Sequence, residues 1–243
     1  FTYLLPITSE GQWNIRASVI FVAAWYVAFA FPLFKQKLPK FTPAFRQESL
    51  LETALYVWKR RELFRLLLAS ALYRDGLATL FAVGGTFAAA AFGRGFSEIL
   101  MFGICLNIMA GLGAIILARL DDIIGSKNVI IVSLSGLIIS GTIIQFLESN
   151  YGFIGMAMVL GIFVGPCQAA SRSFVARLAP EDKRAAIFGF YALSGKAVAF
   201  AGPLVYGGLT LLSGSARIGL ASIVAFWLAG LLIIWTIKKE GTP

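Results

Sequence analysis

The sequence has no histidine among its 243 residues and only two cysteines, Cys105 and Cys167. Without histidine, this chain cannot form a Ser-His-Asp triad, an imidazole proton shuttle or a His-based zinc site. Both cysteines lie inside apolar stretches, so we expect packing residues rather than a disulfide framework or a Cys-ligated metal. No cluster of nucleophile, base and metal ligand stands out, so the sequence predicts neither an enzyme nor a resident metal or cofactor.

Charge is also scarce, since charged residues make up 14% of the chain and hydrophobic residues 58%, with a net charge of +9. Soluble domains average about 45 to 50% apolar and about 25% charged residues. The basic residues fall in short clusters between apolar stretches and do not form a stripe with interleaved aromatics, which a nucleic-acid interface needs. We therefore expect an integral membrane protein without a nucleic-acid partner.

Seven apolar runs are long enough to cross a hydrocarbon core of about 30 Å, which takes about 20 helical residues. These runs lie near residues 17–34, 63–92, 97–118, 128–147, 152–172, 185–212 and 216–237. The fold class is therefore predicted as an all-α membrane protein with seven transmembrane helices.

The distribution of positive charge predicts how these helices are oriented. The one long polar segment, residues 35–62, is basic, whereas the loops on the opposite side hold only Arg94 and Arg217, with Arg16 at the first boundary. The other basic residues on the side of that segment are Arg119, Lys127, Arg172, Arg177, Lys183, Arg184, Lys238 and Lys239. Because cytoplasmic loops carry an excess of Lys and Arg, we expect the N-terminal end outside and the C-terminus in the cytoplasm.

One span, a basic linker and six further spans are the order expected of a piece of a larger transporter. A transporter built of two six-span halves joined by a cytoplasmic linker would show this order if its first five spans were absent. Residues 1–34 would then be the last span of the N-terminal half, 35–62 the linker, and 63–243 the C-terminal six-helix domain. The chain begins with Phe and shows no signal-peptide pattern, so we expect that an N-terminal half, the partner of this domain, is missing.

Three charged residues lie at membrane depth, where charge is expensive and usually functional. Arg74 and Asp75 lie midway along the second span and Lys196 near the middle of the sixth. Helix neighbours point about 100° apart, so we expect Asp75 to pair with Lys196 while Arg74 faces a cavity and attracts an anionic group of the substrate. A structural ion pair is the alternative. As the only carboxylate well inside a span, Asp75 is also the leading proton carrier if transport is proton-coupled.

The fifth span carries Gly165 and Pro166 just before Gln168. Proline and glycine loosen the helical hydrogen-bond ladder, and broken or bent helices are where transporters expose backbone groups to substrate. Gln168 is therefore a candidate ligand contact. A kink held by interhelical hydrogen bonds near the cytoplasmic surface is the alternative.

The segment GAIILARLDDIIGSKNVI resembles the cytoplasmic signature loop of the major facilitator superfamily, an Asp followed by an Arg, then Gly and two basic residues. Asp122, Gly125 and Lys127 match this pattern, whereas Ile123 and Ser126 stand at the usual basic positions. The segments LYRDGLATLFAVGG and GPCQAASRSFVARLAPEDKRAAIFGFYALSGKAVAFAGP, with the topology, resemble the vacuole-effluxer-like branch, also called the unknown major facilitator family.

This resemblance covers residues 15–237 and implies a secondary transporter with a cavity between two six-helix halves and alternating access. It implies that Asp122, Gly125 and Lys127 belong to a conformational latch on the cytoplasmic face. Eukaryotic members are similar to vacuolar amino-acid exporters, which suggests amino-acid efflux. The short loops suggest a bacterial cytoplasmic (inner) membrane.

Three functions remain open at this point. The first is transport of a small-molecule substrate, the second is flipping of a lipid or lysolipid, and the third is a noncatalytic role through helix packing with a partner. The intramembrane charges favour transport over the third function. The expected partners are the small-molecule substrate, the lipid bilayer and the N-terminal half.

Overall fold

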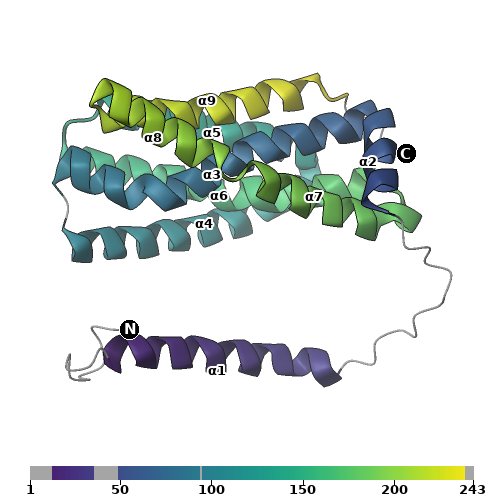
Figure 1. Ribbon diagram of the computed structural model, residues 1–243, viewed down its shortest axis with the longest axis horizontal. Coiled ribbons are helices and arrows are strands. Elements are labelled where there is room, and N and C mark those ends of the chain that lie inside the picture. The colour runs from purple at the N-terminus through teal and green to yellow at the C-terminus, as the bar shows by residue number, and fades with distance from the viewer. Residues whose placement is uncertain (1–12, 36–48, 94, 239–243) are drawn as a thin grey trace. The chain divides into compact units, whose positions relative to one another are not determined.

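The computed structural model describes residues 13–35, 49–93 and 95–238, and the regular structure in these ranges is helical (Figure 1). The helices are α1 Trp13–Lys35, α2 Leu50–Lys59, α3 Arg61–Phe92, α4 Phe96–Ile124, α5 Ser126–Phe146, α6 Asn150–Leu178, the 3-10 turn η2 Glu181–Lys183, α7 Arg184–Val198, α8 Ala201–Ser213 and α9 Ala216–Thr236. Helix α1 belongs to one compact unit and α2 to α9 form another. The predicted all-α class is confirmed.

Six helical segments are long and apolar enough to cross a membrane. They are Arg61–Phe92, Ser97–Ile124, Ser126–Phe146, Asn150–Leu178, Glu181–Ser213 and Ala216–Thr236. They correspond to six of the seven predicted spans. The apolar part of α1, Arg16–Pro32, is helical but shorter than these six, so the seventh crossing stays a prediction, as does the division into two halves and a linker.

The polar segment predicted as a linker contains a helix, α2. Its start is fixed by a capping box, in which the Ser49 hydroxyl accepts the N–H of Glu52 at 3.1 Å and the Glu52 carboxylate accepts the N–H of Ser49 at 3.2 Å. Thr53 and Val57 are buried, and α2 packs against α3 and α7. Helix α3 then begins at Arg61, two residues before the predicted span.

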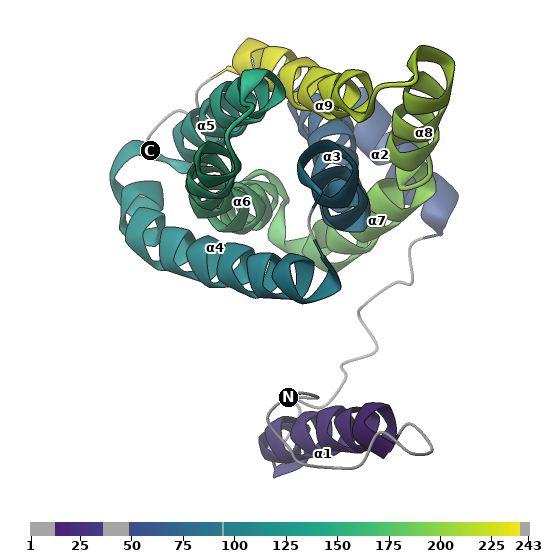
Figure 2. The same ribbon diagram turned by 90° about the vertical axis from the view of Figure 1, so that its left-hand side faces the viewer.

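In the larger unit, the helices pack as a continuous chain of neighbours, in the order α4, α6, α5, α9 and α3. Helix α7 lies against α3, and α8 lies against both α3 and α9, as the view along the helices shows (Figure 2). The largest fully buried side chains of this unit include Tyr73, Leu134, Phe174, Ile223 and Trp227.

The basic residues of this unit gather at one end of the bundle, which we call the basic end. It holds the start of α3, the α4–α5 and α6–α7 turns and the residues after α9. The basic residues there are Lys59, Arg60, Arg61, Arg65, Arg119, Lys127, Arg177, Lys183, Arg184 and Lys238.

Glycine brings α4 and α6 into backbone contact. Gly113 lies against the Ile162 carbonyl and Gly165 against the Ala110 carbonyl, with no room for a side-chain carbon at either glycine. Pro166 has no N–H to donate to Ile162, four residues earlier, yet α6 runs through Pro166 without a break. The freed Ile162 carbonyl is packed against α4. Helix α6 is therefore not broken at this proline, and the role of Gln168 as a ligand contact stays a prediction.

The helix break lies instead in the predicted span 185–212, between α7 and α8. Pro203 cannot donate to the carbonyl of Ala199, and its ring crowds that carbonyl. The N–H of Ala199 makes only a long bond of 3.4 Å to Lys196 O. The span is therefore two half-helices, and Lys196 lies in the last turn of the first.

Candidate functional site

The sequence suggested that the carboxylate of Asp75 pairs with Lys196. In the structure it does not. Asp75 is 1% exposed, and its Oδ2 accepts the N–H of Gly202 at 2.7 Å. Within the described ranges no ion pair joins Asp75 to Lys196, which is exposed. The expectation is wrong because the break between α7 and α8 creates a helix N-terminus, whose unpaired N–H groups and positive dipole attract a carboxylate.

The close approach of α8 to Asp75 depends on Gly202. A Cβ at this position would lie 3.1 Å from Asp75 Oδ2 and would collide with the hydroxyl of Thr79. That hydroxyl donates to the carbonyl of Asp75 at 2.8 Å. Asp75 Oδ1 is buried and has no hydrogen-bond partner among the described residues. Asp75 therefore caps α8 from α3 with one oxygen and keeps the other unused.

Arg74 is held by α7. Its Cζ lies 4.2 Å from the centroid of the Tyr191 ring, and its Nη1 donates to the Tyr191 carbonyl at 3.1 Å. Gly195, one turn further along, leaves space for the guanidinium, because a Cβ there would lie 2.9 Å from Arg74 Cζ. The side chain is half-buried and has no carboxylate partner in the part of the chain that is described. A cation–π contact and one hydrogen bond thus position Arg74 while the rest of its donors stay available.

A buried hydrogen bond between Tyr73 and Ser171, which precede Arg74 and Arg172 in the sequence, connects α3 to α6. The hydroxyls of Tyr73 and Ser171 are 2.6 Å apart, and Ser171 donates to the carbonyl of Cys167. Because the serine proton is used in that bond, Tyr73 donates to Ser171. Sequence reading missed this buried link, since Tyr73 and Ser171 carry no charge and lie 98 positions apart.

Gln168 lines a groove between α3, α4 and α6, with a volume of about 500 Å³. Asn107 of α4 and Arg172, one turn after Gln168 on α6, line the same groove, and Phe81 of α3 adds an apolar wall. Sequence reading counted Arg172 only as a loop charge and missed Asn107. The sequence did carry a signal for Asn107, because it is a polar residue inside the apolar run 97–118.

The residues predicted to form the latch lie at the α4–α5 turn of the basic end. Gly125 has a φ of +83°, which glycine adopts without strain. Arg177 Nη2 lies 3.9 Å from Asp122 Oδ1 and 3.7 Å from Asp121 Oδ2. The side chain of Asp121 is 14% exposed and that of Asp122 is 86% exposed. Asp121, which the sequence pattern did not select, is therefore the better placed partner of Arg177.

Lys127 binds a different element. Its Nζ donates to the carbonyls of Trp235, at 3.3 Å, and Ile237, at the end of α9. A lysine at a helix C-terminus satisfies unpaired carbonyls and the negative end of the dipole. The α4–α5 turn thus contacts α6 through its carboxylates and α9 through Lys127, and its action as a latch stays a prediction.

Comparison with known proteins agrees with the sequence pattern. The profile of the family described as "Vacuole effluxer Atg22 like" matches residues 2–241. The chain is 27% identical to the uncharacterized MFS-type transporter YxiO of Bacillus subtilis (strain 168), over 93% of this chain and 54% of that protein. It is 24% identical to Autophagy-related protein 22-2 of Aspergillus niger, over 81% of this chain and 35% of that protein. It is 21% identical to Autophagy-related protein 22 of Yarrowia lipolytica, over 84% of this chain and 41% of that protein.

The chain spans between about a third and about half of the length of these relatives. Its apolar helices make it an integral, multi-pass membrane protein. The match over nearly the whole chain confirms the predicted resemblance, and the chain belongs to the vacuole effluxer Atg22-like family of the major facilitator superfamily.

Proposed function

We propose that the protein moves a small solute across a membrane by alternating access, and that helices α3, α4 and α6 supply this chain's share of the substrate pathway. The observation that carries the proposal is the polar groove between these helices, lined by Asn107, Gln168 and Arg172. Polar and charged groups on membrane helices are expensive and occur where a solute or ion passes. The relative named as an MFS-type transporter and the family described as vacuole effluxer Atg22-like support the same function.

In this proposal the four predicted pathway residues have different tasks. Arg74 binds an anionic group of the solute, and Gln168 offers an amide in the groove. Lys196, exposed at the end of α7, adds positive charge where the span is broken. Asp75 belongs to the coupling step, because its unused Oδ1 is a buried place for a proton.

Amino-acid efflux is the solute class and direction that we propose first. The family description includes the word effluxer, and an amino acid carries both a carboxylate for Arg74 and an ammonium for the amide oxygens of the groove. We place the protein in a bacterial cytoplasmic membrane with its basic end inside, since cytoplasmic loops are rich in Lys and Arg and one relative is from Bacillus subtilis.

The test is flux of a pooled set of amino acids in proteoliposomes that contain the full-length protein, with and without a proton gradient. Arg74→Gln and Gln168→Ala are compared with Arg119→Gln, a matched loss of charge at an exposed position of α4. We expect gradient-dependent flux that falls at least about tenfold, or 1.4 kcal/mol, in the first two variants and persists in the third. Flux equal to that of empty liposomes would remove the amino-acid proposal.

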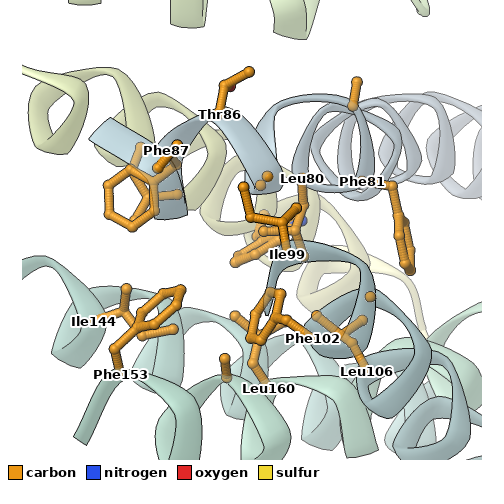
Figure 3. A pocket seen from close by; sticks show the side chains of 18 residues that line it. Leu80, Phe81, Thr86, Phe87, Ile99, Phe102, Leu106, Ile144, Phe153 and Leu160 are labelled. Atoms are coloured by element: carbon orange, nitrogen blue, oxygen red, sulfur yellow. The ribbon is translucent and has the colours of Figure 1, made fainter. Parts of the chain in front are cut away.

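A second candidate, lipid flipping, is favoured by one observation. An apolar cavity of about 420 Å³ lies in the half of the bundle away from the basic end, among α3, α4, α5, α6 and α9. Phe87, Phe102, Phe153 and Leu160 face it (Figure 3). Such a cavity suits an acyl chain.

Flipping of a fluorescent lysolipid in the same proteoliposomes tests the second candidate. Gly103 lines the cavity, and nothing lies within 4 Å of a Cβ added there, so Gly103→Leu should fill the space without a clash. Gly155→Leu, on α6 and equally open, is the control. Lipid flipping that Gly103→Leu blocks and Gly155→Leu does not would favour this candidate over solute transport.

A further inference from the structure

We propose that α2 is an interfacial helix that binds the surface of an anionic membrane. Its exposed apolar stripe, which consists of Leu51, Leu55 and Trp58, lies among the headgroup ends of the acyl chains. The basic residues that follow the stripe bind the headgroups of anionic phospholipids. Helix α2 takes no share in the solute pathway, so this inference holds or fails independently of the transport function.

Helix α2 runs across the bundle and not along it. Figure 1 shows the membrane-spanning helices lengthwise, with α2 lying across the ends of α3 and α7 at the basic end. With ten residues, two of them the charged Glu52 and Lys59, α2 is too short to cross a hydrocarbon core of about 30 Å. A helix in this direction lies in the plane of the membrane surface.

The side chains of α2 divide into three faces. Successive residues of a helix point about 100° apart, which places the apolar stripe within a sector of about 60°. Its residues are 71%, 53% and 70% exposed in chain order. Thr53 and Val57 are buried on a second face, against the bundle, and Glu52 and Lys59 are exposed on a third. Such a helix suits the place where protein, lipid and water meet.

The stripe lies at the level where the hydrocarbon core begins. Trp58 packs edge-on against Phe64 of α3, with ring centroids 4.9 Å apart, and Phe64 lies near the start of the apolar run of that span. The distance along the chain from Lys59, the end of α2, to Leu63 corresponds to about 6 Å of helix rise. Interfacial helices bury their apolar face about 5 to 10 Å into the boundary between headgroups and acyl chains, and Trp is enriched there.

Positive charge gathers beside the stripe. Lys59, Arg60 and Arg61 are consecutive and exposed, and none of them forms an ion pair with a carboxylate in the ranges that the structure describes. The ring of Tyr56 on α2 has Arg60 Cζ at 5.2 Å from its centre and Lys183 Nζ, from the α6–α7 turn, at 5.0 Å. Cations from two segments of the chain therefore meet at this helix, and they complement an anionic surface.

This charge selects the kind of lipid. Each Lys or Arg close to an anionic membrane surface strengthens the attraction about fivefold. The cytoplasmic leaflet carries the negative surface potential, and the basic end is the end that we place on that side. A neutral bilayer would bury the stripe equally well but would leave the basic residues without counter-charges. Helix α2 therefore prefers anionic phospholipid.

Fluorescence quenching with the full-length protein in nanodiscs tests the depth of the stripe. A bimane label is attached at Leu51→Cys in a protein whose other cysteines are replaced by alanine. Glu181→Cys, 93% exposed on the turn after α6, is the control for a position in water. The quenchers are iodide and a phospholipid with a nitroxide near the top of its acyl chain. We expect the lipid to quench the label at position 51 several-fold more than iodide does, and the reverse at position 181.

The same label measures the preference for anionic headgroups. Phosphatidylglycerol and phosphatidylcholine, each carrying the nitroxide, are compared at equal mole fraction, and we expect the first to associate at least about tenfold more strongly. Arg61→Gln should lower this ratio about fivefold, whereas Arg61→Lys, which keeps the charge, should stay near it. Arg119→Gln, a loss of charge on α4 away from α2, should leave the ratio unchanged. The unfolding midpoint of each labelled variant shows whether it is folded.

Four outcomes would overturn the inference. Quenching by iodide that is as strong at position 51 as at position 181 would place the stripe in water. No quenching by either reagent would show that another part of the protein, such as the expected N-terminal half, covers the stripe. Equal association of the two lipids would remove the anionic partner. A preference that Arg61→Gln leaves unchanged would show that the basic residues after α2 do not bind the headgroups.

Discussion

At the residue scale, Asp75 is a side chain on one helix that caps another. We predict that Asp75→Ala lowers the free energy of unfolding by about 1 to 3 kcal/mol, because it leaves the N–H of Gly202 buried without an acceptor. Asp75→Asn should lower it less, since the amide oxygen can still accept that bond. Denaturant titration in mixed micelles measures both variants, and equal losses would contradict the capping role.

The same pair of variants separates capping from proton coupling. Asp75→Asn keeps an acceptor but removes the ionisable group. If Asp75 carries the coupling proton, transport by Asp75→Asn should no longer respond to a proton gradient although the protein remains folded. An unchanged pH dependence would leave Asp75 with the capping role alone.

Sequence alone could identify Arg74 and Asp75 as candidate site residues, because a charge inside an apolar run is a strong local signal. It could not identify their partners. Lys196 was the expected partner of Asp75 because side-chain charge is visible in a sequence, whereas the actual partner is a backbone N–H that becomes available only where a helix begins. Likewise, Asp121 and Asp122 look equivalent in sequence, and only the packing against α6 makes Asp121 the more buried of the two.

At the element scale, the contact between α4 and α6 depends on the absence of side chains. We predict that Gly113→Ala lowers the free energy of unfolding by about 1 to 3 kcal/mol, because the new methyl group would meet the carbonyl of Ile162. Gly111→Ala, two residues earlier in α4 with nothing within 4 Å of its Cβ, is the matched control. It should be neutral or stabilising by up to about 1 kcal/mol. Equal effects in the two variants would argue against close packing of α4 and α6.

The spans could be located from sequence because a long apolar run with almost no charge is typical of a membrane-spanning helix. The two prolines could not be told apart. Pro166 and Pro203 both lie inside apolar runs, but the carbonyl freed by Pro166 packs against Gly113 and α6 stays whole. Ahead of Pro203 the helix is interrupted between α7 and α8, and Asp75 binds the start of α8. Tertiary contacts decide whether a proline bends a helix or ends it.

At the scale of the whole molecule, the α4–α5 turn contacts α6 and α9 at the basic end. We predict that Arg177→Gln changes the unfolding free energy by less than about 1 kcal/mol, because partly exposed ion pairs contribute little. If the turn is a latch, the same variant should change the transport rate several-fold. Arg184→Gln, which loses only an exposed pair with Glu181 within its own segment, should leave the rate unchanged. Equal rates for Arg177→Gln and the wild type would reduce the Arg177 pairs to a packing contact.

The charge difference between the two ends of the bundle predicts how the protein lies in the membrane. The basic end holds most of the described lysines and arginines of the α2–α9 unit, whereas Arg217 lies near the opposite end, where it donates to the carbonyls of Gln145 and Leu147. We therefore predict that the basic end faces the cytoplasm. An even number of crossings between α3 and α9 then places both the start of α3 and the end of α9 there.

Single cysteines in a chain with Cys105 and Cys167 replaced by alanine measure this orientation. Tyr151, 88% exposed after the α5–α6 turn, and Glu181, 93% exposed after α6, lie at opposite ends of the bundle. In intact cells, a membrane-impermeant thiol reagent should label Tyr151→Cys, and it should label Glu181→Cys only after the membrane is permeabilised. The reverse pattern would invert the topology. The α4–α5 turn, with the ion pairs of Arg177, would then face the outside, and the excess of Lys and Arg at the basic end would no longer mark the cytoplasmic side.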